Sequence, residues 1–204
     1  MLGSRFALCC GFAVLPMVVT AQEALTDSIP FHQRQWAAQF GGGTSFLSLG
    51  FLRFTTPSHA WLVDFHFNGG HSHHYAYAND TLTAQGFSSV ANVNTRVGRR
   101  FYQTHGKAVV SFQTLGLLGG FAHQCSESTP PSFGACTNGW TAGAFGEIGA
   151  AYMVTRRFSV GGAGTLAFSY ERSTTKAAGE GVIDREWSYE ASIQGLSFAA
   201  TVYF

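Results

Sequence analysis

Apolar and polar side chains alternate along much of this chain with a period of two residues. In the segment 158–171, Leu166, Phe168 and Tyr170 share one parity, and small or polar side chains hold most of the other. The segments 60–68 and 89–101 alternate in the same way. Successive side chains of a strand point to opposite faces, whereas a helix repeats every ~3.6 residues. The pattern therefore predicts strands with one apolar and one polar face.

Marking every such run predicts eight strands. They lie at 35–42, 46–54, 60–68, 88–101, 107–121, 140–154, 158–171 and 188–204. Apart from a short first hairpin at 43–45, tight turns alternate with long polar connections, which we expect to be loops at 69–87, 122–139 and 172–187. Short and long connections in alternation are typical of an up-and-down barrel whose two rims face different compartments.

Composition decides which solvent the apolar faces meet. Charged residues make up 11% of the chain, whereas a soluble domain has about 25%. Aromatic residues gather near the strand ends. Trp36 and Trp61 lie near tight turns, at the level of Phe54, Phe101, Tyr102 and Tyr203, and Trp140 and Trp187 lie at the opposite ends. Two aromatic belts indicate two bilayer interfaces. A soluble β-sandwich remains the alternative.

The charges are nearly balanced, with 12 Lys and Arg against 11 Asp and Glu. A nucleic-acid partner is not expected, because no basic excess is present to neutralise a phosphate backbone. Arg53, Arg99, Arg100 and Arg156 flank the tight turns, where we expect a basic collar at the rim.

The N-terminus has the layout of a secretory signal peptide. Arg5 precedes an apolar run from Phe6 to Val19, and Val19-Thr20-Ala21 offers the small residues of a cleavage site. We expect a cleaved signal peptide at 1–21, a short periplasmic N-terminal segment at 22–34, and a membrane barrel at 35–204. No later segment is apolar for long enough to form a transmembrane helix.

The last strand carries a family resemblance. Leu196, Phe198 and Val202 share one face with Phe204, at which the chain ends. This segment resembles the terminal strand of bacterial outer-membrane β-barrels, and in size the chain is most similar to the small OmpA/OmpX-type barrels. The resemblance implies an all-β, eight-stranded, antiparallel up-and-down transmembrane β-barrel in the cell outer membrane. It also implies that the barrel-assembly machinery reads Phe204 during biogenesis. Above Gly195 the parity reverses, which a β-bulge or exit from the membrane would explain.

Several charged side chains have inward parity, including Asp64, Arg96, Glu147 and Glu171. The interior of an eight-stranded barrel is just wide enough for side chains to fill it. Buried charges there must pair. We therefore expect Asp64, Arg96 and Glu147 to form a charge network that plugs the barrel, with a proton or ion path as the alternative.

Histidines gather at His66, His71, His73 and His74. Imidazoles bind zinc, copper or nickel, but spacings of one and two in an irregular loop fix no geometry. We therefore expect no metal site and no cofactor. Outer-membrane lipid A deacylases pair a His with a nearby Ser, whereas here the residue two after His66 is Asn68. We expect no catalytic residues.

Two cysteines, Cys125 and Cys136, follow the signal peptide, and export permits a disulfide between them in the long loop 122–139. The sequence thus favours an outer-membrane scaffold whose long loops serve surface interaction, adhesion or envelope integrity. Its partners would be the lipid bilayer, the assembly machinery and an extracellular ligand of the loops. A channel for small solutes or hydrophobic ligands is the first alternative, and a lipid-modifying enzyme is the second.

Overall fold

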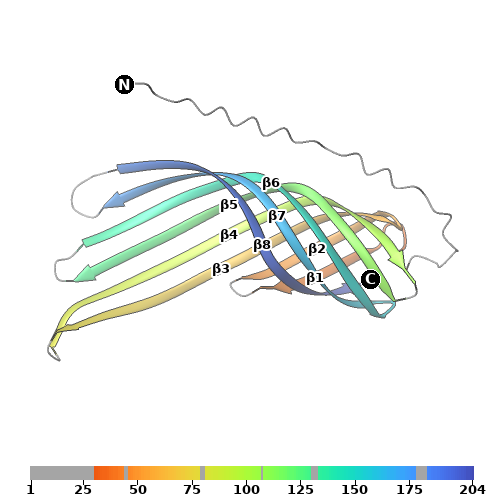
Figure 1. Cartoon of the computed structure of the whole chain (residues 1–204), viewed down its shortest axis with the longest axis horizontal. Helices are drawn as coiled ribbons and strands as arrows, with labels where there is room; N and C mark the ends of the chain where they lie inside the picture. The colour runs from red at the N-terminus through yellow and green to blue at the C-terminus, as the bar shows by residue number, and fades with distance from the viewer. Residues whose placement is uncertain (1–29, 44–45, 79–80, 107, 130–132, 178–182) are drawn as a thin grey trace, which may run out of the picture.

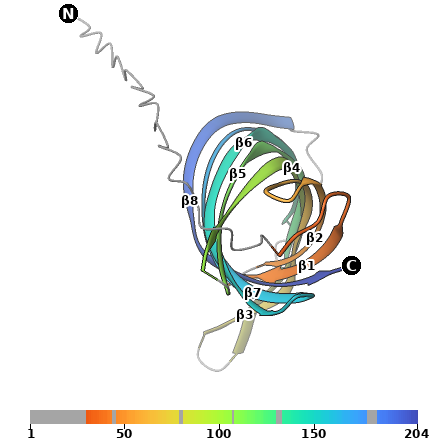
Figure 2. The ribbon, with the colours of Figure 1, turned by 90° about the vertical axis from the view of Figure 1, so that its right-hand side faces the viewer.

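The computed structural model describes residues 30–43, 46–78, 81–106, 108–129, 133–177 and 183–204. These residues form eight antiparallel strands that close into one barrel, which Figure 2 shows from one end. The strands are β1 (Trp36–Gly42), β2 (Leu47–Thr56), β3 (His59–Ala78), β4 (Thr81–His105), β5 (Val109–Thr129), β6 (Phe133–Thr155), β7 (Phe158–Ala177) and β8 (Ile183–Tyr203). The expected up-and-down barrel is confirmed. No helix in this part of the chain is long and apolar enough to cross a membrane. The predicted signal peptide lies outside the described residues.

The strands differ greatly in length. β1 and β2 have 7 and 10 residues, whereas β4 has 25. The expectation of long irregular loops at 69–87, 122–139 and 172–187 was wrong, because most of these residues continue β3 to β8 as hairpins. Strands in water can be polar on both faces, so the apolar alternation that marks a membrane strand disappears there. In Figure 1 the long hairpins extend to the left, well beyond β1 and β2.

The outer surface of the barrel is apolar. Ile148, Leu117 and Phe168 are 72%, 69% and 58% exposed, although each is a large apolar side chain. Inside, Asp64 and Glu147 are 0% and 4% exposed. A soluble barrel would show the opposite arrangement, so the alternation seen along the sequence corresponds to a lipid-facing outside and a polar inside.

Both described chain ends and the tight turns lie at one end of the barrel, which we call the turn end; the opposite end is the hairpin end (Figure 1). On the outer surface at the turn end, the guanidinium of Arg53 lies 5.4 Å from the centre of the Trp36 ring. The guanidinium of Arg99 lies 5.6 Å from the centre of the Trp61 ring. Register places these four residues in one row across β1 to β4. Basic and aromatic side chains therefore alternate at this rim.

Three aromatic residues assigned to this belt from the sequence instead lie inside. Phe54, Tyr102 and Tyr203 are at most 6% exposed. Their level along the strands is that of the belt, but their parity is inward. The assignment used the level alone and was therefore wrong.

The wall of the barrel is incomplete towards the hairpin end. Among the described pairs, β3 beyond Phe67 pairs only with β4, and β8 before Phe198 pairs only with β7. The short β1–β2 hairpin closes the ring below this level and leaves β3 and β8 without a common neighbour above it. Within the described residues the wall therefore lacks backbone pairing between these two strands, and we call this gap the side opening.

The irregularity expected near Gly195 is a bulge. Ala163 pairs with Ser197, but Thr165 pairs with Gln194, so β8 holds one residue more than β7 over this interval. The extra residue turns Ile193, which is 86% exposed, to the same outer face as Leu196. Of the two explanations for the change of parity, the structure supports the bulge.

The structure contains the Cys125–Cys136 disulfide. The two residues lie opposite each other on β5 and β6. The bond therefore joins two paired strands of the hairpin end, and does not cross-link an irregular loop as the sequence suggested.

Candidate functional site

An aromatic cluster fills the interior at the turn end. Phe31 precedes β1 and folds back into the barrel, where its ring centre lies 4.6 Å from Phe54, 4.9 Å from Tyr102 and 5.1 Å from Tyr203. The backbone N–H of Arg34 donates to the carbonyl of Phe54 over 2.8 Å, which holds this segment against β2. We call Phe31, Phe54, Tyr102 and Tyr203 the aromatic stopper. Part of the segment 22–34, expected to lie outside the barrel, thus contributes to its core.

Arg100 lies next along the barrel axis and is fully engaged. Its guanidinium donates to Glu147 Oε1 at 2.6 Å, to Gln39 Oε1 at 2.8 Å and to Thr114 Oγ1 at 2.9 Å. It also lies 4.3 Å from the centre of the Phe112 ring. These partners come from β1, β5 and β6, so one side chain ties together strands across the interior.

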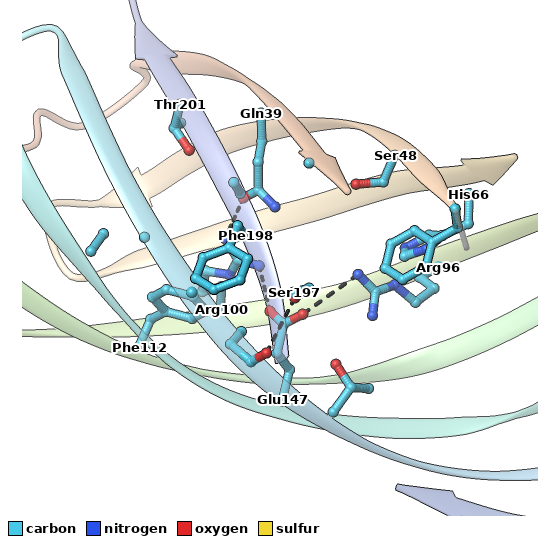
Figure 3. Close-up of a pocket in the computed structure, with 18 of the residues that line it drawn as sticks. Gln39, Ser48, His66, Arg96, Arg100, Phe112, Glu147, Ser197, Phe198 and Thr201 are labelled. Carbon is cyan, nitrogen blue, oxygen red and sulfur yellow. Dashed lines mark hydrogen bonds and ion pairs between the residues drawn. The ribbon is translucent and has the colours of Figure 1, made fainter. Parts of the chain in front are cut away.

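Arg96 lies two repeats of the pleat from Arg100 on β4 and is bound less completely. Its guanidinium donates to Asp64 Oδ2 and lies 3.5 Å from Glu147 Oε2, and it stands over the ring of Phe145. Two atoms here, Arg96 Nε and Asp64 Oδ1, are buried without a hydrogen-bond partner. Figure 3 shows the two guanidiniums on either side of Glu147.

The three residues expected to form the plug, Asp64, Arg96 and Glu147, are brought together by the fold. Arg100 was missed, because it was assigned to the basic collar near the tight turn. It is 2% exposed and shares the inward parity of Arg96, four residues earlier, and this parity was the signal available in the sequence. With Arg100 included, two guanidiniums face two carboxylates, so the buried charges balance.

His66 closes the ionic layer towards the hairpin end. Its Nε2 lies 2.8 Å from Asp64 Oδ2, and the ring of Phe46 lies 4.9 Å away. Ser48 lies opposite His66 on β2. No hydrogen bond joins Ser48 to His66 among the described contacts, and Asp64 is also engaged by Arg96. Asp64 and His66 are therefore joined by a structural hydrogen bond, and within the described contacts Ser48 is not aligned with His66 as a nucleophile with its base.

Two cavities adjoin the side chains of this layer. The smaller one, shown in Figure 3, has about 40 Å³, enough for a few water molecules. The larger one has about 440 Å³ and lies towards the hairpin end. Polar and apolar surface contribute about equally to its lining, and the polar residues include Asn68, Asn92, Asn94, Thr141, Ser169, Glu171, Glu190 and Ser192. Phe46, His66 and Arg96 line both cavities and so stand between them.

The larger cavity reaches the side opening. Phe67 on β3 and Leu196 on β8 both line it, although each belongs to the outer face of its strand. These two residues flank the place where the wall is missing. The cavity therefore extends between β3 and β8 to side chains of the outer surface.

The other predicted residues have the following places. Phe204 is 69% exposed and exchanges backbone hydrogen bonds with Trp36, which extends the β1–β8 pairing to the last residue. Its role in assembly stays a prediction. Within the described ranges, no three His, Cys, Asp or Glu side chains form a group that could hold a metal ion.

Comparisons with known proteins agree on the fold. No family model and no curated protein matches the chain. A major outer membrane protein of Thermus thermophilus is similar over 83% of this chain and 98% of its own, at 12% identity and a TM-score of 0.54. OprG of Pseudomonas aeruginosa matches 87% of this chain and 99% of its own at 11% identity, with a TM-score of 0.49. CarO2 of Acinetobacter baumannii matches 85% of this chain and 100% of its own at 8% identity, with a TM-score of 0.43. The chain has the fold of outer-membrane β-barrel proteins.

Proposed function

We propose that this protein is a non-conducting outer-membrane scaffold that presents its hairpin end to the outside of the cell. Its function is carried by the tall hairpins of β3 to β8, through surface interaction, adhesion or support of the envelope. It has no active site in this proposal, and its partners are the lipid bilayer, the barrel-assembly machinery and an extracellular ligand of the hairpins.

The filling of the turn end by aromatic rings and paired charges is the observation that supports this proposal. The aromatic stopper fills the turn end, and the paired charges of Asp64, Arg96, Glu147 and Arg100 lie directly above it. An ion crossing the barrel would have to displace buried aromatic rings and then break ion pairs that have little water to replace them. A scaffold does not require an ion to cross the barrel, so this arrangement suits it.

The orientation follows from the biogenesis that we expect. A cleaved signal peptide exports the chain, and an even number of strands returns both ends to the same side. With both ends in the periplasm, the row of Arg53 and Arg99 meets the inner leaflet, and the hairpins with the disulfide extend into the medium, where a disulfide is stable.

Planar-bilayer recording tests the proposal. The folded barrel, inserted at single-molecule density, should give no steady conductance in concentrated potassium chloride. A pore-forming porin in the same membrane serves as the positive control. Steady unitary currents from the wild-type barrel would overturn the scaffold and favour a channel.

A second function, binding of a hydrophobic ligand that leaves sideways, is favoured by the opening between β3 and β8. The cavity of about 440 Å³ is blind towards the turn end but is flanked by Phe67 and Leu196 at the gap. A fluorescent long-chain fatty acid is a suitable probe. Binding that is lost in Leu196→Trp, which narrows the opening, but kept in Phe198→Trp would support this function; equal binding by both would contradict it.

A further inference from the structure

Two histidines of the β3–β4 hairpin lie on one face of one strand. His71 and His73 belong to β3, not to an irregular loop, and they share the outward parity of Trp61 and Phe67. Both side chains are exposed. A spacing of two fixes no geometry in a loop, but on a strand it places both side chains on the same face, next to each other.

The two rings are placed as a chelating pair. Their Nε2 atoms lie 3.1 Å apart, and the ring planes meet at 83°. Zinc binds imidazole nitrogen at ~2.0–2.1 Å, so two nitrogens at this separation subtend an angle of about 100° at a shared ion. That angle lies between the ~90° of square-planar and the ~109° of tetrahedral coordination. A metal ion can therefore reach both nitrogens with little movement of either ring.

Neighbouring aromatic rings hold this arrangement in place. The ring centre of Phe87, on β4, lies 5.9 Å from that of His71. Tyr75 stacks on His73 with ring centres 6.4 Å apart and an angle of 14° between the planes. The pair thus sits in a short aromatic row, which limits the rotamers available to the imidazoles and lowers the entropy lost when an ion binds.

The other histidines of the tract have different surroundings. His66 is bound to Asp64 in the barrel interior, and His74 points to the opposite face of β3, where its Nε2 lies 3.2 Å from Ser72 Oγ. Within the described ranges, no third His, Cys, Asp or Glu joins His71 and His73. Two protein ligands leave the remaining coordination positions to water.

We propose that His71 and His73 form a surface site for one divalent transition-metal ion of the zinc, nickel and copper class. Two neutral imidazoles suit these ions, whereas calcium and magnesium require oxygen ligands. Copper(II) is expected to bind more tightly than nickel or zinc, since affinity for nitrogen ligands rises along the series to copper. The site does not depend on the proposed scaffold role or on the orientation of the barrel.

Calorimetric titration of the folded barrel in detergent micelles with Zn²⁺ tests the proposal. We expect one site per barrel. Because the second imidazole binds as part of a chelate, His71→Ala and His73→Ala should each weaken binding by about 100-fold. The matched control is His74→Ala, which removes the adjacent imidazole from the other face and should leave the affinity unchanged. Folding of each variant is checked by its mobility shift between heated and unheated gel samples.

Electron paramagnetic resonance of added Cu²⁺ provides a readout that a change in folding does not imitate. The wild-type signal should show coupling to two imidazole nitrogens, and His73→Ala should show coupling to one. If an alanine variant does not fold, His71→Gln and His73→Gln replace it in both experiments. Equal Zn²⁺ affinity in the wild type, His71→Ala and His73→Ala, or a wild-type Cu²⁺ signal from a single nitrogen, would overturn the site.

Discussion

The two buried guanidiniums differ in how well the surrounding side chains satisfy them. Arg100 donates to a carboxylate, an amide oxygen and a hydroxyl, whereas Arg96 keeps its Nε without a partner. A buried charge is costly unless its hydrogen bonds are made, so the same residue type has two different roles here. Arg100 acts as the structural anchor of the interior, and Arg96 is the weaker member that separates the two cavities.

Replacing Arg100 with Ala should therefore lower the free energy of unfolding by about 3–5 kcal/mol, because Glu147 keeps its buried charge and loses its closest cation. Urea-induced unfolding in micelles, followed by tryptophan fluorescence, measures this. Arg99→Ala is the matched control. Its guanidinium lies outside, on Trp61, and its loss should cost about 1 kcal/mol or less. Equal costs at both positions would show that the Arg100 pairs contribute little.

At the scale of elements, small residues decide how closely the strands and their inward rings approach. A Cβ placed on Gly116 of β5 would lie 2.3 Å from the carbonyl oxygen of Val97 and 2.7 Å from the ring of Phe145. That ring lies beneath Arg96. The glycine thus makes room for the aromatic platform of the ionic layer.

Gly116→Ala should accordingly destabilise the barrel by about 1–3 kcal/mol through overpacking. On the same strand, a Cβ on Gly119 would have 3.7 Å to its closest contact, so Gly119→Ala should be near neutral. Unfolding of the two variants under identical conditions provides the comparison. A neutral Gly116→Ala would mean that β4 and β5 separate without cost.

The two faces of β7 should respond differently to charge. Phe168 is 58% exposed on the outer face, and Phe168→Arg should cost up to about 4 kcal/mol, depending on its depth in the bilayer. Thr165 is inward and lies opposite Glu147, so Thr165→Lys meets a carboxylate and a cavity and should cost less. The free energy of unfolding in lipid vesicles decides the order, and the reverse order would contradict the assigned faces.

We expect the disulfide to stabilise one hairpin and not the whole barrel. Cys125 and Cys136 join β5 and β6 near the end of their hairpin, where β5 also pairs with β4 and β6 also pairs with β7. Replacing both with Ser should weaken this hairpin by up to about 3 kcal/mol. Amide hydrogen exchange should then accelerate in β5 and β6 towards the hairpin end and stay unchanged in β3. Uniform acceleration in all strands would show a global role instead.

At the scale of the whole molecule, two layers of side chains lie in series along the barrel. The aromatic stopper fills the turn end, and Arg96, His66 and Phe46 separate the two cavities further along. Under the proposed scaffold function each layer blocks ions by itself. We therefore expect conduction to require two changes, at positions that are far apart in the sequence.

We expect Arg96→Ala and Phe31→Ala to remain nearly silent in planar bilayers and the double variant to show frequent conductance events. Steady currents from Arg96→Ala alone would mean that the stopper does not seal. If the correctly folded double variant does not conduct, a further barrier lies at Arg100 and its hydrogen-bond partners.

Alternation along the chain determined the architecture by itself. Outward Phe168 and inward Thr165 differ by parity alone, so the sequence predicted the strands, their order and their lipid faces, and it placed Asp64, Arg96 and Glu147 inside. Parity is local, and a strand keeps it except at a bulge such as the one in β8. The structure contains the predicted disulfide, which joins two paired strands instead of closing an irregular loop.

Tertiary structure decided what depends on register and on contacts between distant segments. Arg100 became the anchor because β4 brings it level with Glu147 and Gln39, and Phe31 entered the barrel because the chain before β1 folds back. The polar segments continue as strands because the neighbouring strands extend equally far and pair with them. The pattern of polar residues in one segment does not show how far its neighbour extends. The pairing of His71 with His73 depends on that same extension, since only a strand places alternate residues side by side.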